Sequence, residues 1–546
     1  MHKVDPVTLQ ILWQRLITLM DEVDIALVRT AFSTIVGETR DFACLIMDGQ
    51  GRSIAQSQLS SPAFTCSLPK AARHMLDVFP PETLVPGDVL VTNDPWLAHG
   101  HKPDVVLVSP LFVDGRPVAY LGTVAHVADI GGRRDEMIAR DMHEEGLMIP
   151  PAKLYEAGEP SRLLFSLIEA NVRTPRLVIG DLMAIVGSHG LGAQRFAELV
   201  DDYGADAFTA AAEQILDLSE TTMRQAIAAL PAGRYRHAVR ADGFGQPLDI
   251  VVEIAIAGDE ISVDLTGSSP GTPDISINCV PNVTHAHVIY PLKCALVPHL
   301  PNNEGLFRPI SVTAPEGSVF NAVKPAPVKA RSKASYHLHN AIFGALTQAM
   351  PERVQAGSGS FWALHLDGRD EEGEPYSVHV LPNGGKGAVE GMDGYPTMAF
   401  PANGTLTPIE IIENAAPVVV TERALRPDSG GAGRYRGGLG QRIVLTGRTQ
   451  DPVRVSIRPD KIRFPAPGIS GGQPGLPGAM VLDGEPQEPH PFQLAAGQRL
   501  VLDLPGGGGF GPPAERAEAA LRQDLHNGYV TEGAARRDYR ATGTER

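Results

Sequence analysis

The feature that most constrains the fold is an abrupt change of sequence pattern at Pro231-Ala-Gly. Residues 164–230 contain few helix breakers and place apolar residues at helical spacing, so they predict amphipathic helices. After the change, residues 231–511 alternate short strand-like runs with loops rich in Gly and Pro, which predicts a β-rich region. A chain that keeps helices and strands in separate blocks is expected to belong to the α+β class.

The two ends of the chain add a second mixed region and a short tail. One or two amphipathic helices are expected from Pro6 to about residue 32, capped by Asp5, and a buried strand is expected over 41–48. We therefore expect four regions: a mixed α/β region at 1–163, a helical segment at 164–230, a β-rich region at 231–511 with one helical interruption near 334–349, and a helical, polar tail at 512–546.

The 57 glycines gather in four runs within the β-rich region, at 383–387, 428–440, 468–478 and 504–511. Because glycine tolerates positive φ and close backbone approach, such runs predict tight turns, with backbone amides that face a ligand or a partner chain as the alternative. None of the runs has the GxxxxGK[ST] spacing of a phosphate-binding loop, so we expect no nucleotide binding by this chain alone.

Charge and composition exclude several classes of partner. The formal net charge is -16, from 47 basic and 63 acidic residues, which argues against nucleic acid or an anionic membrane as the main partner. No apolar run approaches the roughly 18 residues of a membrane span, and the N-terminal segment lacks the pattern of a signal peptide. The four cysteines are widely spaced and are expected to be small buried side chains in a reducing compartment. We therefore expect a cytoplasmic protein.

The segment at 93–132 concentrates the residues that carry chemistry. It reads NDPWLAHGHKPDVVLV, then a turn, then YLGTVAHVADIGG, so that two polar clusters flank an apolar, strand-like run. His and Asp side chains bind first-row divalent metals, and two clusters at strand ends can bring several ligands to one point. The candidate ligands are His101, Asp104, His126, Asp129 and, from the start of another buried strand, Asp41.

His99 is the weakest candidate in this segment, because it lies on a glycine-flanked loop where its side chain can face solvent. The alternative interpretation of the whole set is that these are polar loop residues that cap turns. As metal ligands they suit Mn, Zn, Fe or Mg, depending on geometry.

Other possible catalytic residues are less well supported. Gly267-Ser-Ser-Pro-Gly271 matches the letters of GxSxG, but an extended, proline-rich segment follows it, so Ser269 is not expected to be a nucleophile. The cysteines lack a nearby basic cluster. Glu144 or Glu145 could act as a general base or orient a metal ligand, although a solvated turn is the interpretation that we favour.

Nine segments spread over nearly the whole chain form an ordered series of motifs. They are ETRDFACLIMD near 38–48, NDPW…HGHKPDV at 93–105, AHVADIGG at 125–132, EEGLMIPPAKLYEAGEP at 144–160, PNNEGLFRPI at 301–310, PIEIIE at 408–413, DSGGAGRYRGGLG at 428–440, LPGGGGFGPPAER at 504–516 and NGYVTEGAARRDY at 527–539. In this order they resemble the hydantoinase B/oxoprolinase family.

The resemblance implies a B-type subunit in a hetero-oligomer with a hydantoinase A-type partner. That partner, an actin-like ATPase, would bind ATP and phosphorylate the carbonyl oxygen of the substrate. The implied activity is ATP-dependent hydrolysis of a cyclic amide of the hydantoin, lactam or 5-oxoproline type. One alternative is a subunit of an acetone- or acetophenone-type carboxylase. Another is a non-catalytic scaffold subunit that binds the A-type partner through its glycine-rich half.

The resemblance also implies a divalent metal, Zn, Mn or Fe, held by Asp41, His101, Asp104 and His126. His126 and Asp129 are the residues to which we assign catalysis.

The chain departs from the family's pattern at Val127, where a second His often stands, and in the loop before His101, which reads AHG in place of GGT or GGS. The missing histidine removes one possible ligand or base, for which His99 could compensate.

Overall fold

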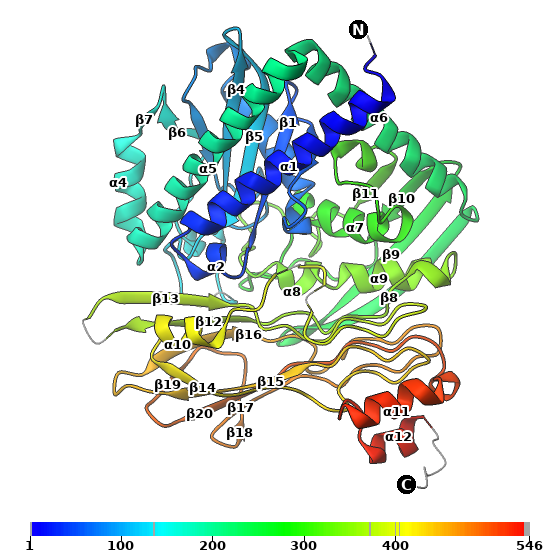
Figure 1. The fold of residues 1–546 in the computed structure, drawn as a ribbon. Helices are drawn as coiled ribbons and strands as arrows, with labels where there is room; N and C mark the ends of the chain where they lie inside the picture. The colour runs from blue at the N-terminus through cyan, green and yellow to red at the C-terminus, as the bar shows by residue number, and fades with distance from the viewer. Residues whose placement is uncertain (1–2, 135–136, 371–372, 399, 403, 540–546) are drawn as a thin grey trace. The chain divides into compact units, whose positions relative to one another are not determined.

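The computed structural model describes residues 3–134, 137–370, 373–398, 400–402 and 404–539. The chain forms two compact units, and neither unit is one continuous stretch (Figure 1). Unit 1 comprises Met1–Ala232, Ile256–Val263 and Pro270–Arg331, and unit 2 comprises Gly233–Ala255, Asp264–Ser269 and Ser332–Arg546.

An antiparallel seven-stranded sheet lies at the centre of unit 1, with the strand order β2-β1-β5-β4-β3-β6-β7. The predicted buried strand is β1, and it forms a hairpin with β2. The strands are β1 (Phe42–Asp48), β2 (Ser53–Gln56), β3 (Val89–Thr92), β4 (Asp104–Val113), β5 (Arg116–His126), β6 (Ala152–Glu156) and β7 (Glu159–Pro160).

Strand β1 is buried at every residue because helices cover both faces of the sheet. Leu45 and Met47 pack in one core cluster with residues of α3 (Ser67–Val78). The opposite face, which carries Thr123 of β5, contacts α5 (Pro175–Tyr203) through a hydrogen bond to His189. Since side chains alternate between the faces of a strand, this two-sided cover explains an apolar run without alternation.

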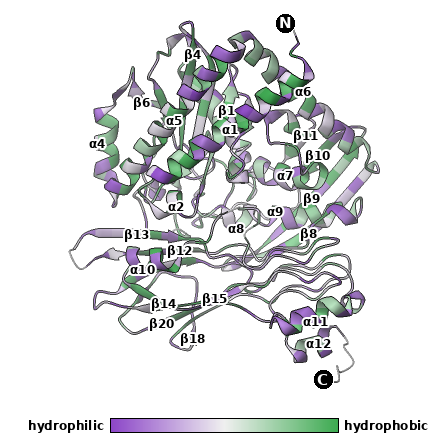
Figure 2. Cartoon of the chain, in the orientation of Figure 1, coloured by the Kyte–Doolittle hydropathy of each residue, from purple (hydrophilic) through white to green (hydrophobic). Residues whose placement is uncertain are grey.

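Helix α1 (Pro6–Thr30) begins where the sequence predicts, with the Asp5 carboxylate accepting hydrogen bonds from the Val7 and Thr8 amides. Apolar and polar residues alternate along it (Figure 2). The other helices of unit 1 are α2 (Thr34–Gly37), α4 (Arg162–Asn171), α6 (Ala205–Ala228) and α7 (Pro281–Leu296).

Two helices of unit 1 bear on the sequence predictions. The prediction of short strands and loops is wrong at α7, whose buried residues lie on all sides of the helix, so the sequence shows no amphipathic period there.

Helix α5 is long and apolar enough to cross a membrane by length and composition, but half of its most apolar stretch is buried in the structure. Buried polar groups such as Asp181 and His189 hydrogen-bond from α5 to neighbouring segments, as in a core helix.

Unit 2 contains two antiparallel sheets that enclose one apolar core, with the orders β13-β12-β16-β19 and β14-β15-β20-β17-β18. Trp362, Leu445 and Leu502 are among the fully buried side chains of that core. The strands are β12 (Ala363–Arg369), β13 (Pro375–Val380), β14 (Val418–Leu425), β15 (Gln441–Gly447), β16 (Val453–Arg458), β17 (Ala479–Leu482), β18 (Glu485–Pro486), β19 (Phe492–Leu494) and β20 (Arg499–Asp503).

A further four-stranded sheet has the order β11-β10-β9-β8, and a turn at Gly258-Asp259 joins two of its strands. The helical interruption predicted near 334–349 is confirmed. The remaining elements are β8 (Gly233–Phe244), β9 (Gln246–Ala257), β10 (Glu260–Asp264), β11 (Ile310–Thr313), α8 (Ser332–Ser335), α9 (Leu338–Leu346), α10 (Ile409–Ala415), α11 (Glu518–His526) and α12 (Glu532–Asp538).

The glycine runs pack backbone against backbone within unit 2. A Cβ on Gly385 would lie 1.9 Å from the Gly438 carbonyl oxygen, and one on Gly437 would lie 2.0 Å from that of Gly507. The Gly507 amide donates to the Gly438 carbonyl at 2.9 Å. Glycine is required at these positions because any side chain would force the backbones apart.

The fold is mixed α+β, as predicted. Of the four predicted regions, the stretch at 231–511 contributes to both compact units, and each of the others lies within one unit. The tail is helical in α11 and α12, and the part of the predicted tail at 540–546 lies outside the described residues.

Candidate metal centre

Two neighbouring strands of unit 1 meet at the candidate centre. Strand β4 begins at Asp104, β5 ends at His126, and these two residues are direct partners in the strand register. Directly opposed residues of an antiparallel pair lie on the same face, about 5 Å apart. His101 lies in the turn before β4, where its carbonyl accepts a hydrogen bond from the Asp104 amide at 3.3 Å. The strand register therefore brings together residues that are separated by a whole hairpin.

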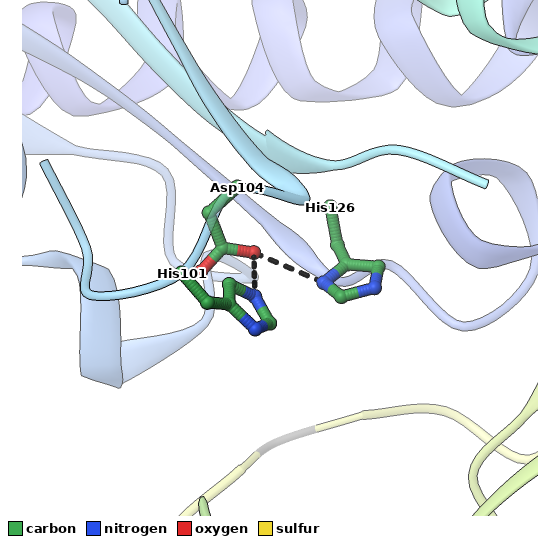
Figure 3. Close-up of side chains that lie close together, drawn as sticks. All are labelled: His101, Asp104 and His126. Carbon is green, nitrogen blue, oxygen red and sulfur yellow. Dashed lines mark hydrogen bonds and ion pairs between the residues drawn. The ribbon is translucent and has the colours of Figure 1, made fainter. Parts of the chain in front are cut away.

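Two buried imidazoles converge on one oxygen of a buried carboxylate, as Figure 3 shows. His101 Nε2 lies 2.8 Å from Asp104 Oδ1, and His126 Nδ1 lies 3.0 Å from the same atom. One ligand atom from each residue fits within 4.8 Å of the others. The group of His101, Asp104 and His126 is called the His–Asp–His cluster below.

The second oxygen of Asp104 is held by Arg331, whose Nη2 lies 2.5 Å from Oδ2. Burial disfavours the charged form of this carboxyl, but His101 and Arg331 together hold the pKa of Asp104 well below its ordinary value. Asp104 is therefore ionised at neutral pH, with Oδ2 bound to the guanidinium and Oδ1 turned toward the two imidazoles.

The hydrogen bond on the far side of His101 decides where its ring carries a proton. Nδ1 lies 2.8 Å from the Lys329 carbonyl oxygen, which can only accept, so Nδ1 carries the hydrogen and Nε2 carries the lone pair. Among the described residues Nε2 has no hydrogen-bond partner, although Asp104 Oδ1 is close to it. A lone pair thus faces a carboxylate oxygen with no proton between them.

Only a cation or a proton can relieve this arrangement. Burial and the charge of Arg331 lower the pKa of His101 to about 3, so a second proton on the ring is disfavoured at neutral pH. The fixed Nδ1–H and the free Nε2 are the state in which a histidine binds a metal. The donor set therefore fits a divalent cation.

Asp41 and Asp129, the two other predicted site residues, lie outside the His–Asp–His cluster. The Asp41 carbonyl accepts from the His126 amide at 3.0 Å, and its Oδ2 lies 4.0 Å from His126 Nδ1, so the side chain flanks the cluster. Asp129 binds the side chain of Arg173 at 2.7 Å and accepts from the backbone amide of that residue. The ligand role of Asp41 and the catalytic role of Asp129 stay predictions.

His99 is buried, contrary to the expectation that it can face solvent. Its Nδ1 lies 2.6 Å from the Ser67 hydroxyl, and its ring packs edge-on against Phe64. Val127, where the family often has a histidine, is also buried. The described structure brings neither residue into the His–Asp–His cluster.

The two glutamates of the motif EEGL differ in their exposure and in their partners. Glu144 forms ion pairs with Arg133 and Arg140 at the surface, which agrees with a solvated turn. Glu145 is only 1% exposed, so a solvated turn is wrong for this residue.

Sequence reasoning missed Lys329 and Arg331, which hold His101 and Asp104 from more than 200 positions away. No sequence motif links residues 328–331 to His101 or Asp104. The fold alone brings the two segments together.

Known proteins resemble this chain along nearly its whole length. The sequence model of the hydantoinase B/oxoprolinase family matches residues 5–513. A putative D-/L-hydantoinase B-type subunit from Pseudomonas sp. (strain NS671) is 30% identical, over 100% of this chain and 96% of that protein.

Two solved structures share the fold. The ATP-dependent caprolactamase from Pseudomonas jessenii aligns with a TM-score of 0.90 at 30% identity, over 98% of this chain and 96% of that one. Nucleotide-free acetone carboxylase aligns with a TM-score of 0.88 at 19% identity, over 98% of this chain and 79% of that one, which shows likeness of fold alone. From the match of the family model and the full-length similarity, the chain belongs to the hydantoinase B/oxoprolinase family.

Proposed function

We propose that this chain is the B-type subunit of an ATP-dependent hydrolase of cyclic amides, and that it works with an A-type ATPase subunit. Similarity along the whole chain to a B-type hydantoinase subunit and to an ATP-dependent caprolactamase supports the activity and the need for a partner subunit. The observation that carries the chemistry is the lone pair of His101 Nε2 facing the ionised Asp104. We also infer a cytoplasmic location, which agrees with the acidic composition.

A divalent cation, Zn, Mn or Fe, would be held by His101, Asp104 and His126, with Asp41 as a further ligand beside them. Such an ion polarises a carbonyl or lowers the pKa of water toward neutrality. Two further residues hold the ligand side chains in the orientation that the ion requires. Lys329 fixes the ring of His101 through Nδ1, and Arg331 holds Asp104 so that Oδ1 stays available.

As a metal ligand, His126 cannot also act as a general base. Its Nδ1 faces Asp104 Oδ1 at 3.0 Å, which is the position of a ligand atom. A neutral ring that binds through Nδ1 keeps its hydrogen on Nε2, so it can donate to a substrate oxygen but cannot accept a proton from water. We therefore assign His126 the ligand role. Asp129, ion-paired with Arg173, is assigned to positioning the segment after β5.

The reaction proceeds from a substrate that the partner has activated. The partner transfers the γ-phosphoryl group of ATP to the carbonyl oxygen of the ring. Water then adds to the carbonyl carbon, the C–N bond breaks, and the ring nitrogen leaves as an amine after taking up a proton. The acyl phosphate that remains is hydrolysed by a second water to a carboxylate and inorganic phosphate.

The test is reconstitution of the chain with an A-type partner, ATP and one substrate from each class: a hydantoin, a lactam and 5-oxoproline. We expect ADP formation coupled to ring opening for one of them. Metal analysis should find nearly one ion per chain. The variant His101→Ala/His126→Ala should lose the ion and more than about 100-fold in turnover, since even residues that only orient a ligand are worth 10–100-fold.

Two outcomes would contradict the proposal. Incorporation of labelled bicarbonate into a ketone, without ring opening, would place the chain with the carboxylases. Unchanged turnover in a folded double variant would show that the chain is a non-catalytic scaffold for its partner.

A further inference from the structure

Glu145 is buried beside the His–Asp–His cluster without belonging to it. It ends a short 3-10 turn, Met142–Glu145. Its Oε1 accepts two backbone hydrogen bonds, from the Val328 amide at 2.7 Å and from the Lys329 amide at 2.8 Å. A buried carboxylate is costly unless hydrogen bonds compensate it, and here both compensating donors come from one distant segment.

That distant segment, residues 328–331, supports two members of the cluster. The Lys329 carbonyl accepts from His101 Nδ1 at 2.8 Å, and Arg331 binds Asp104 at 2.5 Å. Lys329 is therefore held through its amide by Glu145 and holds His101 through its carbonyl. The segment is neither helix nor strand, so its position depends on such individual contacts.

The backbone that carries Glu145 is itself held in place. The buried Lys102 ammonium donates to the Gly146 carbonyl at 2.6 Å, and the Leu147 amide donates to the Ile130 carbonyl at 2.8 Å. Gly146 has a φ of +116°, and a Cβ there would lie 2.4 Å from the Ile130 oxygen. The carboxylate is thus presented from a tightly packed turn rather than from a flexible loop.

We propose that Glu145 is a positioning residue of the metal centre. It clamps residues 328–331 so that His101 keeps its lone pair on Nε2 and Asp104 keeps Oδ1 turned toward the two imidazoles. This inference rests on the proposed function, because it assigns Glu145 a role at the same site. Loss of the clamp should weaken metal binding, since residues that orient ligands typically contribute 10–100-fold to affinity.

The experiment compares Glu145→Ala, Glu145→Gln and Glu145→Asp with Glu144→Gln, a matched change at the neighbouring surface residue. The probe is Co²⁺ alone, titrated into the full chain and followed by its visible absorption and by chelator competition. Glu145→Ala should weaken Co²⁺ binding by about 10–100-fold and alter the absorption bands. Glu145→Gln keeps one acceptor oxygen and should recover part of the affinity, and Glu144→Gln should stay within about twofold of the wild type.

A second readout needs no metal. In the metal-free chain with ¹⁵N-labelled histidine, the shifts of His101 should report a hydrogen on Nδ1 in the wild type and a mixture of tautomers in Glu145→Ala. If Glu145→Ala fails to fold, the Gln and Asp variants carry the same comparison.

The outcomes separate the two proposals. Unchanged Co²⁺ affinity and unchanged His101 shifts in a folded Glu145 variant would overturn the positioning role. A wild-type chain that binds no Co²⁺ would overturn the metal centre, and the His101 shifts would then decide the positioning role by themselves.

Discussion

Each unit buries a carboxylate among histidine and basic side chains, and the two clusters are connected differently. In unit 2, His337 Nε2 lies 3.1 Å from Asp460, and its Nδ1 lies 3.3 Å from the Lys461 ammonium. Lys333 donates to the Pro459 carbonyl at 2.5 Å and lies 3.4 Å from Asp460. Both ring nitrogens of His337 therefore have partners. In unit 1, the residues that the structure describes give His101 a hydrogen-bond partner at Nδ1 but none at Nε2.

The comparison shows that residue types alone do not mark a metal site. Asp460 is buried, as Asp104 is, and despite the cost of burial its pKa is also held well below the ordinary value, by His337 and the two lysines. The difference lies in the lone pair, because a ring that accepts from an ammonium has none left for a ligand. We therefore interpret the unit 2 cluster as structural. The predictions below test that distinction, from the largest expected effect to the smallest.

Asp460→Asn should destabilise unit 2 by about 3–5 kcal/mol, because it leaves the buried Lys333 and Lys461 without their carboxylate. Denaturant unfolding measures the loss. Asp451→Asn, at an exposed position of the same unit, should change stability by no more than about 0.5 kcal/mol. The metal content of Asp460→Asn should equal that of the wild type. Loss of metal in the folded variant would show that the clusters do not differ as we describe.

His101→Ala and His337→Ala form a matched pair, since each removes a fully buried imidazole and leaves a similar cavity. His101→Ala should lose metal and more than about 100-fold in turnover, roughly 2.7 kcal/mol. His337→Ala should keep both but unfold more easily than metal-free His101→Ala, by about 2 kcal/mol, because Asp460 loses its donor and Lys461 its acceptor. Equal loss of turnover in the two variants would contradict the distinction between a metal centre in unit 1 and a structural cluster in unit 2.

His189 is a buried histidine to which no carboxylate hydrogen-bonds within the described part of the chain, so it shows how burial alone changes the pKa of a histidine. Its nitrogens bind the Ser109 and Thr123 hydroxyls, and burial lowers its pKa to about 4. The His189 imidazole is protonated near pH 6.5 in the unfolded chain but only near pH 4 in the folded chain. Stability is therefore lost as the pH falls from 6.5 toward 4. The loss should reach about 2 kcal/mol by pH 5, at 1.36 kcal/mol per unit.

His189→Gln does not titrate, so its unfolding free energy should fall less between pH 7.5 and pH 5 than that of the wild type. Parallel pH profiles for the two proteins, measured by denaturant unfolding, would show that His189 keeps an ordinary pKa when folded.

The local patterns predicted much of the fold for identifiable reasons. Asp5 and Pro6 start α1 as expected because capping is a local interaction within one turn. Helix α7 escaped prediction because burial on every side removes the periodicity on which helix prediction relies. The glycine runs indicated close backbone approach, but their mutual packing, as between Gly385 and Gly438, depends on partners far along the chain.

The sequence by itself determined the family and the α+β class and predicted the proposed ligand side chains, because these follow from local residue patterns and ordered motifs. Only the tertiary structure decided which side chains meet. The strand register set Asp104 opposite His126, and residues 328–331 supplied the two contacts that leave a lone pair on His101 and turn Oδ1 of Asp104 toward the imidazoles. Proton position and charge in a buried site depend on neighbours in space, and spacing along the chain does not encode them.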